Sequence, residues 1–319
     1  MPRVVLLRRR WIHAWAVGLV GLLALAGCRS SPDTPEEGAA RVVDDRGRTV
    51  AVERPVERVQ SLAPNLTELV VAAGGGDALV GVTTADNYPP QVDSLPAVSA
   101  LPVDFEAITA LNPDLVLATT QVNVPRDAET FASVGLPVYF FSFETVQDVF
   151  DAVRTLGTLL GTDATAQQRA DRLAARLDSL RARTAKAERP RVLVLIGDDT
   201  LYAFGGDSYI HTLVDAAGGR SITASMEAAA PTLSDEYVLE ERPDVIIGAW
   251  GETYDPARLL ELHPTWDVVP AVQNGRVYSV HPDLLLRPGP RLVDGAWQMA
   301  AALHPDRVRD ALPQGPATP

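Results

Sequence analysis

The feature that most constrains the fold of this chain is an internal repeat. Its four parts occur in the same order in both halves: RVQSLAP from 58 and RVLVLIG from 191, LVVAAGG at 69–75 and LVDAAGG at 213–219, EAITALNPDLVL at 106–117 and EYVLEERPDVII at 236–247, and SVGLPVYFF at 133–141 and VQNGRVYSV at 272–280. Several ordered matches are much harder to produce by chance than one short match. The sequence therefore predicts two similar units.

Each half alternates apolar strands with helical segments. PDLVLA at 113–118 and PDVIIGAW at 243–250 are short continuous apolar runs, typical of parallel strands that are buried on both faces. The alternation of strands and helices predicts a parallel sheet with covering helices in each half. The predicted fold class is α/β, with two similar lobes that contain parallel sheets.

A helical connection is predicted over 144–190, between the two halves. Apolar residues recur at helical intervals on both sides of a break near Gly161: Val149, Val153, Leu156 and Leu160, then Ala170, Leu173, Leu177 and Leu180. Thr162 or Asp163 is expected to cap the second segment and Pro190 to end it. Such a long backbone helix would hold the lobes at a set distance, with a ligand cleft between them.

The N-terminal residues 1–27 have the layout of a secretory signal. Four arginines, Arg3, Arg8, Arg9 and Arg10, precede an apolar stretch of about 17 residues that ends in small residues. A retained anchor helix is an alternative, although this stretch is short for a bilayer span of about 20 residues. Leu25-Ala26-Gly27-Cys28 resembles the bacterial lipoprotein box, in which the cysteine is lipid-modified.

Cys28 is the single cysteine of the chain, so no disulfide is expected. The alternative to lipidation is a buried or stray thiol, because free cysteine behaves as a small hydrophobic residue. Lipidation would leave the exported domain to be held together by its core alone. We expect the mature chain to be tethered to a membrane through Cys28.

Composition and charge bound the remaining segments. The polar, proline-rich stretch RSSPDTPEEGAA at 29–40 cannot bury enough apolar surface to fold. Residues 28–319 carry a net charge of −17, against −13 for the whole chain, because the four arginines before Cys28 are removed. This excess of acid disfavours nucleic acid as a partner. The expected organisation is a signal peptide (1–27), a disordered tether (28–40), an N-terminal lobe (41–143), the helical connection (144–190), a C-terminal lobe (191–308) and a disordered tail (309–319).

Two long runs carry a family resemblance. RVQSLAPNLTELVVAAGGGDALVGVTTADNYPPQV followed by FEAITALNPDLVLA, and HPDLLLRPGPRLVDGAWQMAAALHP in the second half, resemble the periplasmic substrate-binding proteins of cobalamin and iron-siderophore ABC importers. The likeness covers about 41–308 and is nearest to the cobalamin-binding members. It implies lobes joined by one rigid backbone helix, with little closure on binding. It also implies a monomeric, exported receptor without enzymatic activity or cofactor, whose partners are an ABC permease and its ATPase.

The resemblance assigns a docking role to one glutamate in each lobe. In this family each lobe presents a glutamate to arginines of the two-fold permease, and Glu106 and Glu236 match that pattern in register across the repeat. Arg–carboxylate pairs are strong and directional, which suits docking. The alternative is that both are ordinary first-turn acids, favoured by the helix dipole.

The expected ligand contacts are polar and aromatic residues at several points of the chain: Asn65, Tyr88, Tyr202, Phe204, Trp250, Asp283 and Arg287. Asp283 and Arg287 match polar positions that contact cobalamin in the family, with a surface ion pair as the alternative. Asn65 is alternatively a helix N-cap, Tyr88 a turn residue, and the other aromatic residues part of the core. Three ring positions of the cobalamin receptors are occupied here by Ala85, Thr119 and Ala230.

Competing functions differ in the residues that they need. The glycine runs lack the spacing of a phosphate-binding motif and no G-x-S-x-G elbow occurs, which disfavours an enzyme. A metal-ion receptor needs several converging ligands, and His281 and Asp283 alone are too few. An iron-siderophore or haem receptor stays open, because Arg287, Tyr202 and Trp250 suit an anionic chelate. The preferred expectation is a receptor for cobalamin or a related corrinoid.

Overall fold

The computed structural model describes residues 39–308. The predicted signal peptide, the lipidation site at Cys28 and the tail from 309 lie outside these residues. Within 39–308, no helix has both the length and the apolar character needed to cross a bilayer. The first two elements are strands β1 (Ala39–Val43) and β2 (Thr49–Glu53), which pair antiparallel. Strand β1 thus begins two residues before 41, the expected start of the N-terminal lobe.

The N-terminal lobe contains a parallel sheet with the strand order β5-β4-β3-β6-β7. Its strands are β3 (Val59–Ser61), β4 (Leu79–Thr83), β5 (Ala97–Val98), β6 (Leu115–Thr119) and β7 (Val138–Phe141). Its helices are α1 (Pro64–Ala72), α2 (Phe105–Ala110) and α3 (Pro125–Ala132), with the short 3₁₀ turns η1 (Gly76–Ala78) and η2 (Pro90–Ser94).

The C-terminal lobe contains a second parallel sheet, with the strand order β11-β10-β8-β9. Its strands are β8 (Arg191–Leu195), β9 (Arg220–Ser221), β10 (Val245–Gly248) and β11 (Val277–Ser279). Its helices are α6 (Ile210–Ala216), α7 (Asp235–Glu241), α8 (Ala257–Leu262), α9 (Pro270–Gln273), α10 (Leu292–Leu303) and α11 (Pro305–Val308), with 3₁₀ turns η3 (Pro264–Val268) and η4 (Pro282–Leu284).

The two sheets repeat one another, as the sequence predicts. Strands β4, β3, β6 and β7 correspond in order to β9, β8, β10 and β11. The Pro-Asp pairs have the same role in both lobes: the carboxylate of Asp114 accepts a hydrogen bond from the backbone N–H of Arg58 at 2.9 Å, and that of Asp244 accepts one from Arg191 at 2.8 Å. The residue before each Pro-Asp pair, Asn112 or Arg242, has a left-handed backbone, with φ of 47° and 43°.

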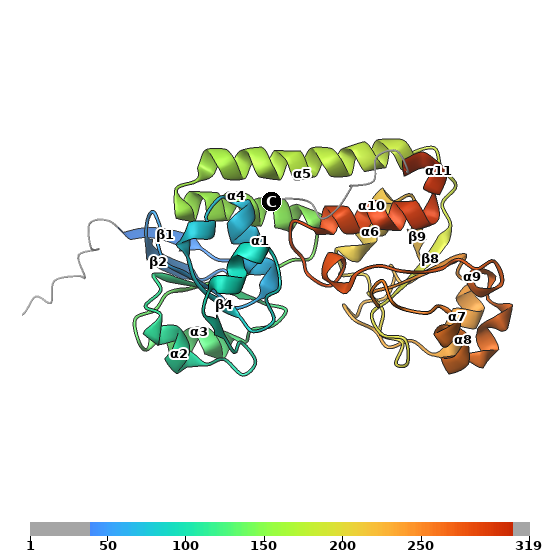
Figure 1. Ribbon diagram of the computed structural model, residues 1–319, viewed down its shortest axis with the longest axis horizontal. Helices are drawn as coiled ribbons and strands as arrows, with labels where there is room; N and C mark the ends of the chain where they lie inside the picture. The colour runs from blue at the N-terminus through green and yellow to red at the C-terminus, as the bar shows by residue number, and fades with distance from the viewer. Residues whose placement is uncertain (1–38, 309–319) are drawn as a thin grey trace, which may run out of the picture. The chain divides into compact units, whose positions relative to one another are not determined.

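The predicted connection consists of two helices, α4 (Val146–Leu160) and α5 (Asp163–Thr184). The break at Gly161 is confirmed, with a left-handed φ of 71°. Thr162 occupies the N-cap position of α5, but its hydroxyl donates to the carbonyl of Ala73 at 2.7 Å instead of capping the helix. Helix α5 ends at Thr184 and not at Pro190. Figure 1 shows α5 running above α4 and α10, so one helix passes along both lobes.

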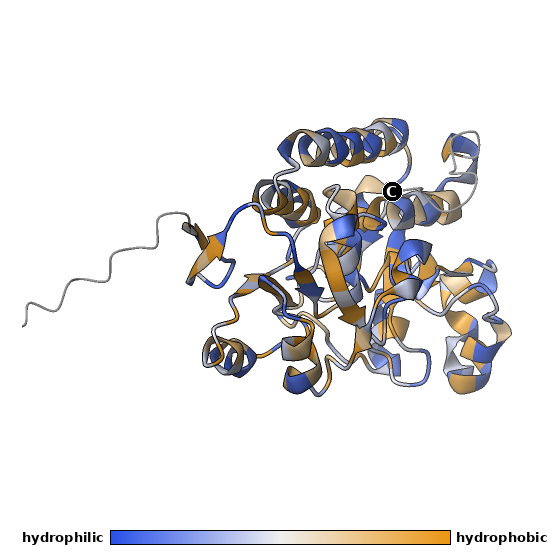
Figure 2. Cartoon of the chain, turned by 60° about the vertical axis from the view of Figure 1, so that its left-hand side comes forward, coloured by the Kyte–Doolittle hydropathy of each residue, from blue (hydrophilic) through white to orange (hydrophobic). Residues whose placement is uncertain are grey.

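Both faces of each sheet are covered, and this accounts for the continuous apolar runs. In β6, Leu115 and Leu117 pack on the side of α1 and α4, whereas Val116 and Ala118 pack on the side of α2 and α3. The α5 side of both lobes forms one continuous hydrophobic cluster, which includes residues of α1, α4, α5, α6 and α10. Figure 2 shows the long helix α5 with many hydrophilic residues, in contrast to the apolar strands inside the molecule. This cluster joins the two lobes.

Candidate functional site

The first turn of α1 contacts the C-terminal lobe. The side-chain amide of Asn65 is buried and donates to the carbonyl of Pro288 at 3.2 Å. Asn65 is not the N-cap, because Ala63 takes that position and Pro64 begins the helix. The alternative interpretation of Asn65 as a cap is therefore wrong, and its side chain connects the two lobes.

Asp283 and Arg287 form a polar network across the same boundary. Arg287 donates to the side-chain carbonyl of Asn87 at 2.5 Å and to the backbone carbonyl of Ala85 at 3.2 Å. The amide of Asn87 donates to Asp283 at 3.1 Å, and Arg287 pairs with Asp283 at 3.2 Å. The structure thus brings these two predicted ligand residues together and places them against the N-terminal lobe. It does so at Ala85, one of the three positions that lack a ring.

An ion pair that joins the two lobes was not found from the sequence. Glu68 in α1 accepts two hydrogen bonds from Arg291, at 2.8 and 2.6 Å. The ring of Tyr88 packs against this guanidinium, and its centroid lies 4.2 Å from Cζ of Arg291. Burial raises the pKa of Glu68, and Arg291 offsets part of this effect. Burial also raises the pKa of Tyr88. One signal was available, because Glu68 is the one charged residue of the segment PNLTELVVA and a buried carboxylate needs a partner.

The predicted aromatic contacts divide into accessible and buried side chains. Tyr202 is 47% exposed, and Trp250 is half-buried with its ring 4.2 Å from that of Tyr254, centroid to centroid. Phe204 is 8% exposed and packs against Tyr209 inside the core, which corrects the expectation that its ring lines the cleft. Tyr209, a further aromatic candidate, is also buried and donates to the carbonyl of Leu285 at 2.9 Å.

Tyr202 and Trp250 share a location that favours ligand binding. They follow the carboxyl ends of β8 and β10, which are adjacent parallel strands paired from Val192–Val245 to Leu195–Gly248. In open parallel sheets, ligands bind outside the carboxyl ends of the strands. The indole N–H of Trp250 is buried without a hydrogen-bond partner among residues 39–308.

Glu106 and Glu236 occupy equivalent positions at the second residue of α2 and α7. Asp104 caps α2 by accepting from the N–H of Ala107 at 3.0 Å, and Ser234 caps α7 by accepting from that of Tyr237 at 3.3 Å. Both glutamates are exposed, and neither forms an ion pair with another residue of 39–308. In Figure 1 both helices lie on the side of the lobes away from α5.

The local environment stabilises the Glu236 carboxylate. Its own backbone N–H at the helix N-terminus and the hydroxyl of Ser234 lower the pKa of Glu236. This effect is expected of any acid in a first helical turn, so it agrees with the alternative interpretation, in which Glu236 only stabilises its helix. The geometry also leaves the outward carboxylate free to pair with a partner.

The histidines do not converge on a metal site. Residues 39–308 contain no group of three or more His, Cys, Asp or Glu side chains that is arranged to hold a metal ion. His281 is exposed, and its ring accepts from the backbone N–H of Asp283 at 3.2 Å. His263 and His304 contact backbone carbonyls within the C-terminal lobe.

Two curated relatives match most of the chain. An uncharacterised ABC transporter substrate-binding lipoprotein of Bacillus subtilis, YvrC, is 28% identical over 311 residues, which are 93% of this chain and 98% of the relative. A vitamin B12-binding protein of Vibrio cholerae is 30% identical and covers 78% of this chain and 90% of its own length. Both relatives thus match over most of their length.

Solved structures agree with the observed lobes. The periplasmic vitamin B12 binding protein BtuF of Vibrio cholerae superposes with a TM-score of 0.69 and 29% identity, covering 78% of this chain and 97% of that structure. A periplasmic haem-binding protein from Pseudomonas aeruginosa gives a TM-score of 0.68 and 27% identity, covering 79% and 94%. The expected fold of two α/β lobes with one backbone helix is therefore confirmed.

The family model described as periplasmic binding protein matches residues 59–284, from the first strand of the N-terminal lobe to η4. Proteins of this family bind solutes for transport. The partners of such receptors are an ABC permease and its ATPase. This chain belongs to the periplasmic binding protein family and is an ABC transporter substrate-binding protein of the class that includes vitamin B12, haem and siderophore receptors.

Proposed function

We propose that this receptor binds cobalamin or a related corrinoid between its lobes and delivers it to an ABC permease. The observation that carries this proposal is the pair of accessible aromatic side chains, Tyr202 and Trp250, outside the carboxyl ends of β8 and β10. A large planar ligand gains contact area from such rings. The vitamin B12-binding relatives, with 30% identity over most of their length, support the same ligand class.

Polar groups at the boundary between the lobes would orient the ligand. Asp283 and Arg287 lie at the boundary between the lobes, where a corrinoid side chain has both an acceptor and a donor within reach. Tyr88 and Asn65 lie on the opposite side of that boundary, in the N-terminal lobe. The lobes would change little on binding, because Asn65 and Arg287 already connect them in this structure.

A haem or a ferric siderophore is the second candidate. The specific observation in its favour is the pair of cations Arg287 and Arg291 at the lobe boundary, since arginine pairs readily with carboxylate groups. The fold that this chain shares with a haem-binding protein supports it as well. The same aromatic residues would then contact the chelate.

Delivery needs a tether and a docking surface. Lipidation of Cys28 after removal of residues 1–27 would keep the exported receptor at a membrane, in the periplasm or on the cell surface. Glu106 and Glu236, one in each lobe, would pair with arginines of the permease. Release of the ligand would follow when the permease separates the lobes.

Tryptophan fluorescence tests the ligand assignment. The chain from Gly38 to Pro319 has three tryptophans, and two of them, Trp266 and Trp297, are buried. A corrin ring that contacts Trp250 should quench its emission saturably when cyanocobalamin or cobinamide is added, with a correction for absorption by the corrin. The variant Trp250→Phe should lose this quenching, and Trp297→Phe should keep it.

The outcomes separate the two candidates. Saturable binding of cyanocobalamin in the submicromolar range supports the corrinoid receptor. Absence of binding by a chain that unfolds cooperatively, together with saturable binding of hemin or a ferric siderophore, would replace cobalamin with the second candidate. Absence of binding for all three ligands would contradict the proposed function.

A further inference from the structure

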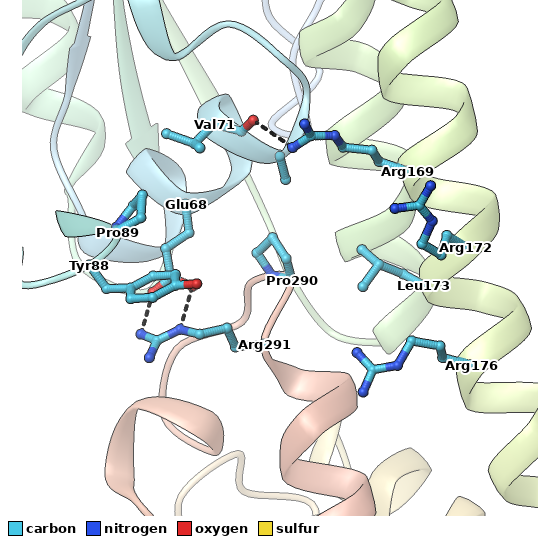
Figure 3. A pocket seen from close by; sticks show the side chains of 11 residues that line it. Glu68, Val71, Tyr88, Pro89, Arg169, Arg172, Leu173, Arg176, Pro290 and Arg291 are labelled. Carbon is cyan, nitrogen blue, oxygen red and sulfur yellow. Dashed lines mark hydrogen bonds and ion pairs between the residues drawn. The ribbon is translucent and has the colours of Figure 1, made fainter. Parts of the chain in front are cut away.

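A cavity of about 100 Å³ lies between α1, α5 and the segment that leads into α10. Figure 3 shows Arg169, Arg172 and Arg176 extending from α5 on one side, with Glu68, Tyr88 and Arg291 on the other.

This cavity adjoins the expected ligand cleft, because Tyr88 lines it and its Arg291 lies 3.6 Å from Asp283 of the boundary network. It is lined by Val71 and Ala72 in the last turn of α1, whereas Asn65 lies in the first turn. Of the predicted ligand contacts, Tyr88 lines it, and Tyr202 and Trp250 do not. The cavity thus lies on the α5 side of the Glu68–Arg291 ion pair.

The cavity contains positive charge that the described residues do not neutralise. Arg291 is paired with Glu68, and Arg176 with Asp294 at 2.7 Å. Arg169 donates to the carbonyl of Val71 at 3.4 Å and has no carboxylate partner among residues 39–308. Arg172 is exposed and forms no hydrogen bond or ion pair within the same residues. Two unneutralised arginines in one cavity contrast with the net charge of −13 of the chain.

The wall between these arginines and the opposite side is apolar. Val71, Ala72 and Leu173 form part of it, together with Pro89 and Pro290. An occupant that fits both features has an anionic head group for the arginines and an apolar body for the wall. The guanidinium group binds carboxylate and phosphate with two parallel hydrogen bonds, so both head groups suit the site.

We propose that this cavity is a second binding site, which takes a small amphiphilic anion with a carboxylate or phosphate head group. Arg169 and Arg172 bind the head group, and Leu173 and Val71 contact the apolar body. The occupant touches α1 of the N-terminal lobe and Pro290 of the C-terminal lobe, but it does not contact the cleft residues Tyr202 and Trp250.

Isothermal titration calorimetry with octanoate and octyl phosphate tests this proposal on the chain from Gly38 to Pro319. Saturable binding at one site is expected for at least one of the two, and the better probe identifies the head group. Octanol and inorganic phosphate, which each lack one half of the ligand, should bind at least tenfold more weakly. Shortening the chain from octanoate to hexanoate should weaken binding by about two- to fourfold per methylene.

Variants locate the site. Arg169→Gln with Arg172→Gln should weaken binding at least tenfold, whereas Arg181→Gln, farther along α5 and paired with Asp178, should leave it unchanged. Leu173→Ala should weaken the octyl probe without removing the charge. Trp250→Phe should have no effect, since it changes the cleft. Circular dichroism and the Tm verify that each variant is folded.

The proposal is overturned if neither octyl probe binds, if octanol binds as tightly as octanoate, or if the double arginine variant binds like the original chain. The proposal is also overturned if the chain sediments with anionic phospholipid vesicles but does not bind octyl phosphate, because the arginines would then contact a membrane surface. Binding that survives a saturating amount of cyanocobalamin supports two separate sites.

Discussion

The first turns of α2 and α7 expose the same kind of residue but pack differently against the rest of their lobes. Both helices begin at a polar cap and present a glutamate at the second position, Glu106 or Glu236. Two residues farther on, Ile108 and Val238 are both completely buried. The first helical residue differs, because it is Phe105 in α2 and Asp235 in α7.

These first residues are held by different chemistry. Phe105 packs its ring against Phe131, with the centroids 4.7 Å apart. Asp235 contacts Nδ1 of the buried His263 at 2.7 Å, while Nε2 of this ring contacts the carbonyl of Asp198 at 2.7 Å. A carbonyl and a carboxylate are both acceptors, so the two bonds form together when both ring nitrogens carry a proton. The comparison teaches that the repeat has kept its exposed glutamates while the packing beneath them has diverged.

The largest effect is expected from removing both exposed glutamates. Glu106→Ala with Glu236→Ala should abolish ligand uptake by cells that contain the permease, and leave the affinity of the isolated receptor for its ligand unchanged. Each single variant should lower uptake by about ten- to a hundredfold, because one charge-assisted contact is lost. Equal losses in the two single variants would extend the equivalence of the lobes from structure to function.

The matched control is Glu129→Ala with Glu240→Ala, which removes one exposed glutamate from each lobe at other positions. Uptake should stay normal in this control. A loss of ligand affinity in the Glu106 and Glu236 double variant would contradict the docking role. If Glu236→Ala lowers uptake and Glu106→Ala does not, docking is restricted to the C-terminal lobe.

The packing beneath the two glutamates should contribute unequally to the free energy of unfolding. His263→Ala removes two hydrogen bonds and a ring stacked on Trp266, so it should lower the free energy of unfolding by about 2–4 kcal/mol. Phe105→Ala removes a half-buried ring and should cost about 1–3 kcal/mol, less than a fully buried phenylalanine. Urea unfolding measures both. A larger loss for Phe105→Ala would reverse the inferred difference between the lobes.

The smallest effect concerns the caps. Asp104→Ala and Ser234→Ala should each lower the free energy of unfolding by about 1 kcal/mol, because one N-terminal N–H loses its side-chain acceptor. Ser234→Ala should also raise the pKa of Glu236, since the hydroxyl helps to lower it. A carbon-detected NMR titration follows this carboxyl directly. An unchanged pKa of Glu236 would assign its shift to the backbone N–H alone.

Much of the fold could be predicted from the sequence because its signals are local. The repeated strands, the Pro-Asp pairs and the break at Gly161 each depend on neighbouring residues or on a pattern written twice. Two predicted details of the helical connection were wrong. Pro190 marks the start of the next strand and not the end of α5, and Thr162 found a carbonyl partner 89 residues away.

The candidate site was harder to predict because its pairs join distant segments. Glu68 and Arg291 are 223 residues apart, and Asn87 and Asp283 are 196 apart. Composition gives no distance between such residues. Phe204 shows the same difficulty, because an aromatic residue after a strand can turn into the core or toward a ligand, and only the packing against Tyr209 decides.

The hydrophobic cluster shared by the lobes has a consequence for how the chain is made. Helix α10 contributes Leu292, Val293, Ala296 and Met299 to it, and these are among the last residues of 39–308 to be synthesised. Helix α10 packs against α5 and α6, so the α5 side of the C-terminal lobe is incomplete until nearly the whole polypeptide has emerged. The C-terminal half is not a finished folding unit before α10 is made, and a chain that stops earlier leaves apolar surface of α6 uncovered.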